Sequence, residues 1–176
     1  MSCTVAISAA HRSYLFREQV IAPALMNCAL NGIIAWLIFR ARSSIPVWGD
    51  GGLVFDTIAT LFLLPFLTCL IVTPLIRRGV AGGKVPPLTW RAAEHGVLGY
   101  LPLSVWGRGA VIGGLAVGAG LPIIFGGLSL AGVAHLAPMN VVVLKGVYTA
   151  MLAGLVGPVI ALCAISDASP APVVAS

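Results

Sequence analysis

The chain has 176 residues, of which 59% are hydrophobic and only 9% charged, and its net charge is +5. This apolar share, with a mean hydropathy of +1.05, excludes a water-soluble domain and indicates a protein that lies mostly within a lipid bilayer. The basic residues lie at the ends of apolar runs, where they contact lipid headgroups, so we expect no nucleic-acid partner.

Four apolar runs of 20 to 25 residues divide the chain. A helix rises ~1.5 Å per residue, so each run is long enough to cross a hydrocarbon core of ~30 Å. We therefore predict an all-α membrane protein with one domain over residues 1–165 and a disordered tail over residues 166–176. The predicted transmembrane spans are residues 20–39, 53–76, 109–133 and 141–165.

The first span carries two amides on one helix face, Asn27 and Asn31, four residues apart. An amide that faces lipid tails has no hydrogen-bond partner, so this face is expected to contact protein. The two side chains either hold helices together by hydrogen bonds or form a polar patch that binds a substrate or an ion. We favour the first interpretation.

The second span carries Asp56 about one turn inside one end, with Thr60 on the same side of the helix. An unpaired carboxylate at the bilayer centre costs ~2.5–3.5 kcal/mol, and less near an interface. Lys145 lies at the same depth in the fourth span. We predict that Asp56 pairs with a basic residue, most favourably Lys145, with Arg40 or Arg42 as the alternatives.

The connection over residues 77–108 is too long for a tight turn between helices. Glycines and a Pro-Pro pair at residues 86–87 break any helix that continues from the second span. Beyond them, residues 90–101 place apolar side chains on one side and Arg91 and Glu94 on another. This pattern predicts a short helix that lies flat in the headgroup region.

The third span has no ionisable residue and contains eight glycines, several of them four residues apart. The fourth span repeats this spacing. Small residues in such a row let another helix backbone approach closely, so the pattern predicts packing between spans three and four or between copies of the protein. The residues concerned are Gly114, Gly118 and Gly126 in span three and Gly146 and Gly154 in span four.

Orientation follows from the Lys and Arg residues that flank the spans. Seven lie on the side of the N-terminus and of the 77–108 connection, and three lie on the opposite side. This asymmetry predicts a multi-pass protein of the bacterial inner membrane with both termini in the cytoplasm.

The sequence offers little for catalysis. It contains no C-x-x-C pair, no metal-ligand spacing of His and Cys, and no His within the four predicted spans. We predict no catalytic residue, no metal, no cofactor and no enzymatic activity.

Three stretches of the middle third of the chain, residues 56–60, 73–78 and 84–90, resemble small uncharacterised four-helix bacterial inner-membrane proteins. The resemblance implies a topology and no activity.

Two functional hypotheses follow. The leading one is a non-enzymatic inner-membrane protein that packs through its Gly-rich helices with itself or with a larger membrane complex. The alternative is a small oligomeric transporter or channel whose polar path consists of Asn27, Asn31, Asp56 and Thr60.

Overall fold

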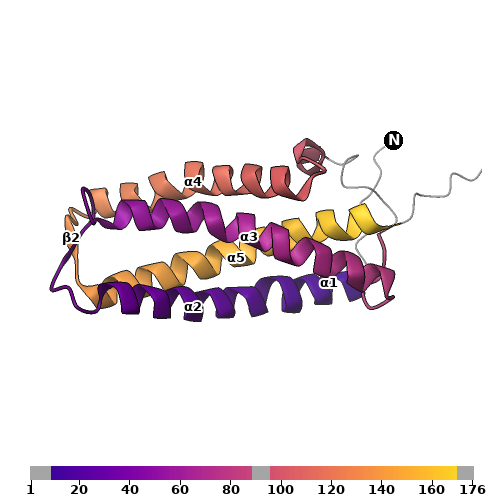
Figure 1. Ribbon diagram of the computed structural model, residues 1–176, viewed down its shortest axis with the longest axis horizontal. Helices are drawn as coiled ribbons and strands as arrows, with labels where there is room; N and C mark the ends of the chain where they lie inside the picture. Colours follow the sequence, from indigo (N-terminus) through magenta and orange to yellow (C-terminus); the bar gives the residue numbers. More distant parts are fainter. Residues whose placement is uncertain (1–8, 89–95, 170–176) are drawn as a thin grey trace, which may run out of the picture.

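The computed structural model describes residues 9–88 and 96–169, and most of them are helical (Figure 1). The helical elements are α1 (Ala9–Tyr14), η1 (Leu15–Ile21), α2 (Ala22–Phe39), α3 (Leu53–Ala81), η3 (Gly96–Tyr100), α4 (Val105–Leu130) and α5 (Pro138–Ala168). Two short strands, β1 (Ile45–Pro46) and β2 (His135–Leu136), complete the described chain. The π-helical element η1 joins α1 to α2 without a break, so these three form one long helix.

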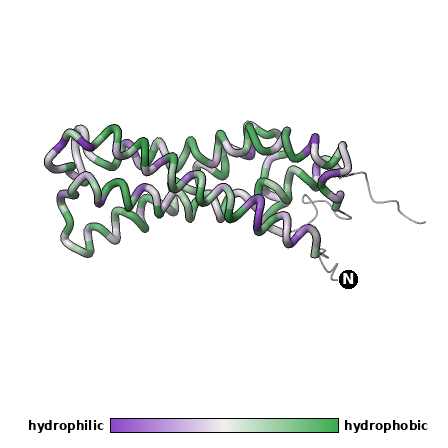
Figure 2. Tube along the Cα trace, turned by 90° about the horizontal axis from the view of Figure 1, so that it is seen from below, coloured by the Kyte–Doolittle hydropathy of each residue, from purple (hydrophilic) through white to green (hydrophobic). Residues whose placement is uncertain are grey.

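Four helices are long and apolar enough to cross a membrane: His11–Phe39, Leu53–Ala81, Val105–Leu130 and Pro138–Ala168. The prediction of an all-α protein with four such helices is confirmed. Hydrophobic residues run along the length of each helix in Figure 2. A helix satisfies its backbone hydrogen bonds internally, which is why a sequence this apolar folds into helices rather than open strands.

Helix α5 is the centre of the bundle. In its most apolar stretch 56% of the residues are buried, against 11–22% in the other three helices. Helices α2 and α3 both pack on α5, whereas α4 packs mainly on α3. The order across the bundle is therefore α2, α5, α3, α4, and α2 and α4 are the outer helices (Figure 1).

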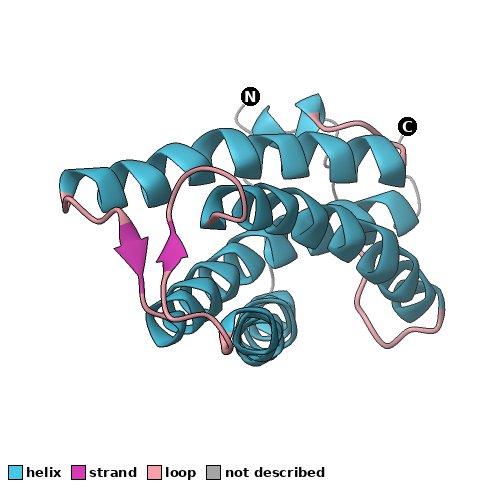
Figure 3. Cartoon of the chain, turned by 60° about the vertical axis from the view of Figure 1, so that its left-hand side comes forward, coloured by secondary structure: helices cyan, strands magenta, loops and turns pink. Residues whose placement is uncertain are grey.

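The two ends of the bundle are closed differently. At one end, which we call the β end, β1 pairs antiparallel with β2 and ties together the connections that follow α2 and α4 (Figure 3). At the other end, the terminal end, α1 begins and α5 finishes (Figure 1). There Asp167 of α5 accepts hydrogen bonds from Arg77 of α3 at 2.8 Å and from Arg108 of α4 at 2.9 Å.

All four helices differ in their bounds from the predicted spans: the first begins before residue 20, α3 ends at Ala81 rather than at residue 76, α4 covers Val105–Leu130, and α5 covers Pro138–Ala168. Two other predictions also change. We assigned residues 166–176 to a disordered tail, but α5 continues to Ala168, because Asp167 at its end pairs with two arginines; residues 170–176 lie outside the described chain. The predicted interfacial helix over residues 90–101 falls partly on residues 89–95, also outside the described chain. Of the rest, only a 3-10 turn, Gly96–Tyr100, is present.

The glycine rows were predicted to pack spans three and four together or to pack copies of the protein; in the described residues spans three and four do not contact each other through them, and the second alternative stays a prediction. Helix α4 meets α3 through Gly109, Gly113 and Gly120: a Cβ at Gly113 would lie 2.8 Å from the carbonyl oxygen of Phe62. The row that we predicted to pack is turned away from the bundle. Among the described residues, no heavy atom outside the local helix lies within 4 Å of a Cβ built at Gly114, Gly118 or Gly126.

The glycines of α5 do pack, but against the first helix rather than against α4. A Cβ at Gly146 would lie 3.3 Å from Sγ of Cys28, and one at Gly154 would lie 3.5 Å from Cγ1 of Val20. Gly157 approaches more closely still, because a Cβ there would collide with the carbonyl oxygen of Gln19. Small residues on α5 thus bring η1 and α2 against its backbone.

Candidate functional site: a cleft between α2 and α3

Because α2 and α3 pack on α5 but not closely on each other, a cleft of about 530 Å³ runs between them. A volume of about 300–1,000 Å³ is usual for small-molecule sites. The cleft extends along α3 from Asp56 to Val72, a length of ~24 Å at ~1.5 Å per residue. This length is comparable with most of the thickness of a ~30 Å hydrocarbon core.

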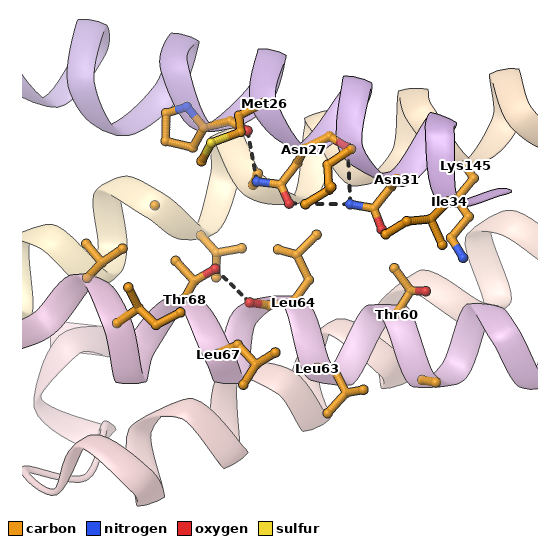
Figure 4. Close-up of a pocket in the computed structure, with 18 of the residues that line it drawn as sticks. Met26, Asn27, Asn31, Ile34, Thr60, Leu63, Leu64, Leu67, Thr68 and Lys145 are labelled. Atoms are coloured by element: carbon orange, nitrogen blue, oxygen red, sulfur yellow. Dashed lines mark hydrogen bonds between the residues drawn. The ribbon is translucent and has the colours of Figure 1, made fainter. Parts of the chain in front are cut away.

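The polar side chains singled out in the sequence line this one cleft. Asn27 and Asn31 come from α2, Thr60 from α3 and Lys145 from α5 (Figure 4). Asp56, also from α3, lines the same cleft. Each of the three helices that form the cleft therefore contributes at least one. Sequence periodicity placed Asn27 and Asn31 on one face of α2 and Asp56 and Thr60 on one face of α3. The packing of α2 and α3 on α5 turns these two faces toward each other.

An ion pair closes the cleft near the β end. Nζ of Lys145 lies 2.6 Å from both carboxylate oxygens of Asp56. The predicted pairing of Asp56 with Lys145 is confirmed. The environments of the partners differ, since the Lys145 side chain is 3% exposed and that of Asp56 is 23% exposed. Both residues line the cleft, and the carboxylate is the more exposed of the two.

The helix dipoles stabilise the charge of Asp56 but not that of Lys145, so Lys145 depends more on the ion pair. Asp56 lies in the first turn of α3, where the positive end of the helix dipole favours a carboxylate. Lys145 lies in the third turn from the start of α5. It is therefore far from the last turn of that helix, where the negative end of the helix dipole would favour a cation. Within the described chain, Asp56 is the acidic partner that neutralises the buried Lys145 ammonium.

The amides and hydroxyls of the cleft direct their hydrogens back to their own helices. Nδ2 of Asn27 donates to the carbonyl oxygen of Pro23 at 2.9 Å, and Nδ2 of Asn31 donates to that of Asn27 at 3.1 Å. The hydroxyl of Thr60 donates to the carbonyl oxygen of Asp56 at 2.8 Å. The side-chain oxygen of Asn31 points into the gap between α2 and α3 (Figure 4).

Apart from Gln19 and Thr68, the rest of the lining is apolar. Away from the ion pair the cleft is walled by long aliphatic side chains, which no pattern in the sequence assigned to a site. They include Met26, Leu30, Leu63, Leu67 and Ile71. Most of these are exposed, as side chains on a lipid-facing helix are, so periodicity alone does not separate lining residues from those that only face lipid.

Two other features escaped the sequence analysis. Gln19 lines the terminal end of the cleft and donates to the hydroxyl of Tyr14 at 3.1 Å. The cluster of Asp167 with Arg77 and Arg108 was missed because Asp167 was placed in the tail. The sequence did contain a pattern that predicts it. Asp167 follows the end of span four on the same side of the membrane as Arg77 at the end of span two and Arg108 at the start of span three.

No group of three His, Cys, Asp or Glu side chains that could hold a metal ion occurs among residues 9–88 and 96–169. Comparison with protein-family models, curated proteins and solved structures found no match to this chain. The resemblance to four-helix inner-membrane proteins therefore stays a prediction, and the geometry of the cleft carries the argument for function.

Proposed function

We propose that this protein is a small membrane transporter that binds a lipophilic molecule in the α2–α3 cleft. The observation that supports this is the convergence of Asn27, Asn31, Asp56, Thr60 and Lys145 on a single elongated cleft. Side chains that served only to hold helices together would bridge α2 and α3 directly. Instead the two asparagines and Thr60 bond within their own helices and leave the gap between α2 and α3 open.

The shape of the cleft favours a ligand that enters from the bilayer. Its walls are aliphatic along most of its length, and its two charged groups lie toward the β end, with Thr68 and Gln19 as polar groups farther along. Small-molecule sites have this composition, with an apolar lining and a few polar groups that fix orientation. An intramembrane ionisable pair at one end is the feature that marks substrate pathways in membrane proteins.

A bulky side chain in the cleft is expected to stop transport. Ala59 lines the cleft, so Ala59→Trp fills it, whereas Ala29→Trp places the same side chain on the part of α2 outside the lining. In proteoliposomes, the wild type and Ala29→Trp should speed the exchange of spin-labelled dodecyl glucoside between leaflets, measured by ascorbate reduction. Ala59→Trp should return the rate to that of protein-free vesicles. Equal rates for the two tryptophan variants would contradict the proposal.

For the location we propose the bacterial inner membrane with both termini in the cytoplasm. The support is the seven-to-three distribution of Lys and Arg. Reporter fusions after Gly83 and Ser176 should give cytoplasmic signals, and a fusion after Trp48 should give an external one. An external signal at Gly83 would overturn this orientation.

Self-association through α4 is a second candidate function, and it corresponds to the leading hypothesis from the sequence. The observation that favours it is the open row at Gly114, Gly118 and Gly126, which the rest of the described chain leaves uncovered. Glycines in such a row allow the close approach of a second helix.

Substituting this row is expected to weaken assembly without unfolding the protein. Gly118→Leu should lower energy transfer between donor- and acceptor-labelled copies in liposomes, because a leucine holds two backbones apart. Ala29→Leu on α2 is the control. If wild type and Gly118→Leu give the same transfer, α4 does not mediate self-association.

A further inference from the structure

We propose that the ligand of the cleft is a single-chain amphiphile with a protonated amine as its head group. The amine is bound by Asp56 and Asn31 near the β end, and the chain lies along the aliphatic walls toward the terminal end. This inference rests on the proposed function, and it adds the chemical class of the ligand.

Hydrogen-bond acceptors dominate the polar end of the cleft. The carboxylate of Asp56 has two oxygens with about four lone-pair directions, and one Lys145 ammonium does not occupy them all. The Asn31 side-chain oxygen points into the gap beside it (Figure 4). The single hydroxyl hydrogen of Thr60 is donated to the backbone of its own helix. A head group that donates hydrogen bonds therefore finds partners here.

The positions of the two charges favour a cation over an anion. Both residues line the cleft, but the Lys145 side chain is 3% exposed and that of Asp56 is 23% exposed, so the carboxylate is the more accessible of the two charges to an entering head group. An anion at that position would face the oxygens of Asp56 and Asn31. An amine head group instead makes charge-assisted hydrogen bonds to the carboxylate, which are about twice as strong as those between neutral groups.

The remainder of the cleft fits one hydrocarbon chain. Leu63, Leu67 and Ile71 follow one another along α3, and Met26 and Leu30 face them from α2. The distance from Thr60 to Ile71 along α3 is ~17 Å at ~1.5 Å per residue.

Photoaffinity labelling in lipid nanodiscs at pH 7 tests the head-group class. The probes are three diazirine-bearing dodecyl chains that differ only in their heads: amine, alcohol and carboxylate. For each probe, labelling of the cleft peptides of α2 and α3 is divided by labelling of α4, which corrects for partition into the bilayer. We expect this ratio for the amine to exceed that for the carboxylate about tenfold, the effect of 1.4 kcal/mol, with the alcohol between them.

Two variants tie the preference to the named residues. Asp56→Asn/Lys145→Met removes both charges, so no buried ammonium is left unpaired, and it should abolish the preference for the amine while alcohol labelling persists. Asn31→Leu should reduce the preference and leave the ion pair intact. Ala29→Leu, outside the lining, should behave as wild type.

The outcomes separate the two proposals. Equal labelling by all three probes at the cleft, above the α4 level, would leave the cleft as a lipophilic site and overturn the amine assignment. A preference for the carboxylate, or an amine preference that survives in the double variant, would also overturn it. Labelling of the cleft no higher than that of α4 with every probe would overturn both the assignment and the proposed function.

Discussion

Asp56→Asn is expected to destabilise the protein by about 3–5 kcal/mol, because it leaves the buried Lys145 ammonium without its partner. Lys145→Met should be less harmful. It leaves the Asp56 carboxylate, which is 23% exposed and lies in the first turn of α3, where the helix dipole favours it. The double variant Asp56→Asn/Lys145→Met should recover much of the loss, since neither charge then remains to be neutralised.

A double-mutant cycle measures this coupling. The free energy of unfolding is determined for the wild type, both single variants and the double variant by SDS titration in mixed micelles. A coupling energy well above the ~0.3–0.5 kcal/mol error of additivity is expected. A double variant as unstable as the sum of the two singles would show that the 2.6 Å contact does not stabilise the folded protein.

Gly157→Leu and Gly113→Leu are expected to unfold the protein or to lower its melting temperature sharply. A Cβ at Gly157 would collide with the carbonyl oxygen of Gln19, and one at Gly113 would lie 2.8 Å from that of Phe62. Both obstacles are backbone atoms, so relief requires two helices to separate. Overpacking of a core, including the backbone shifts that it forces, typically costs about 1–3 kcal/mol and occasionally more.

Gly114→Leu is the matched control. It lies on the same helix as Gly113 and receives the same side chain, but among the described residues nothing outside its own helix lies within 4 Å of the new Cβ. Its melting temperature in detergent should equal that of the wild type. If Gly113→Leu melts at the same temperature as Gly114→Leu, α3 and α4 do not pack as the structure places them.

The amino-acid sequence by itself determined the helices, because in a bilayer the length and hydropathy of each segment decide whether it crosses. Four apolar runs became four helices, although α5 extends past its predicted end to Ala168. The pairing of charged residues could also be predicted from their depth in the spans, because a charge near the end of one span is stabilised by an opposite charge at the same depth in another. Asp56 and Lys145 meet for that reason.

Only the tertiary structure decided which helices are neighbours. A row of glycines permits close approach but does not specify the partner, so the pattern in α4 did not predict that Gly113 contacts α3 while Gly114 stays open. Likewise Asn27 and Thr60 each mark a polar face, and only the packing of α2 and α3 on either side of α5 makes those faces line one cleft. In a soluble protein, hydropathy separates the residues of the core from those in water. In lipid most of each helix surface is apolar whichever helix it contacts, so hydropathy does not determine which helices are neighbours.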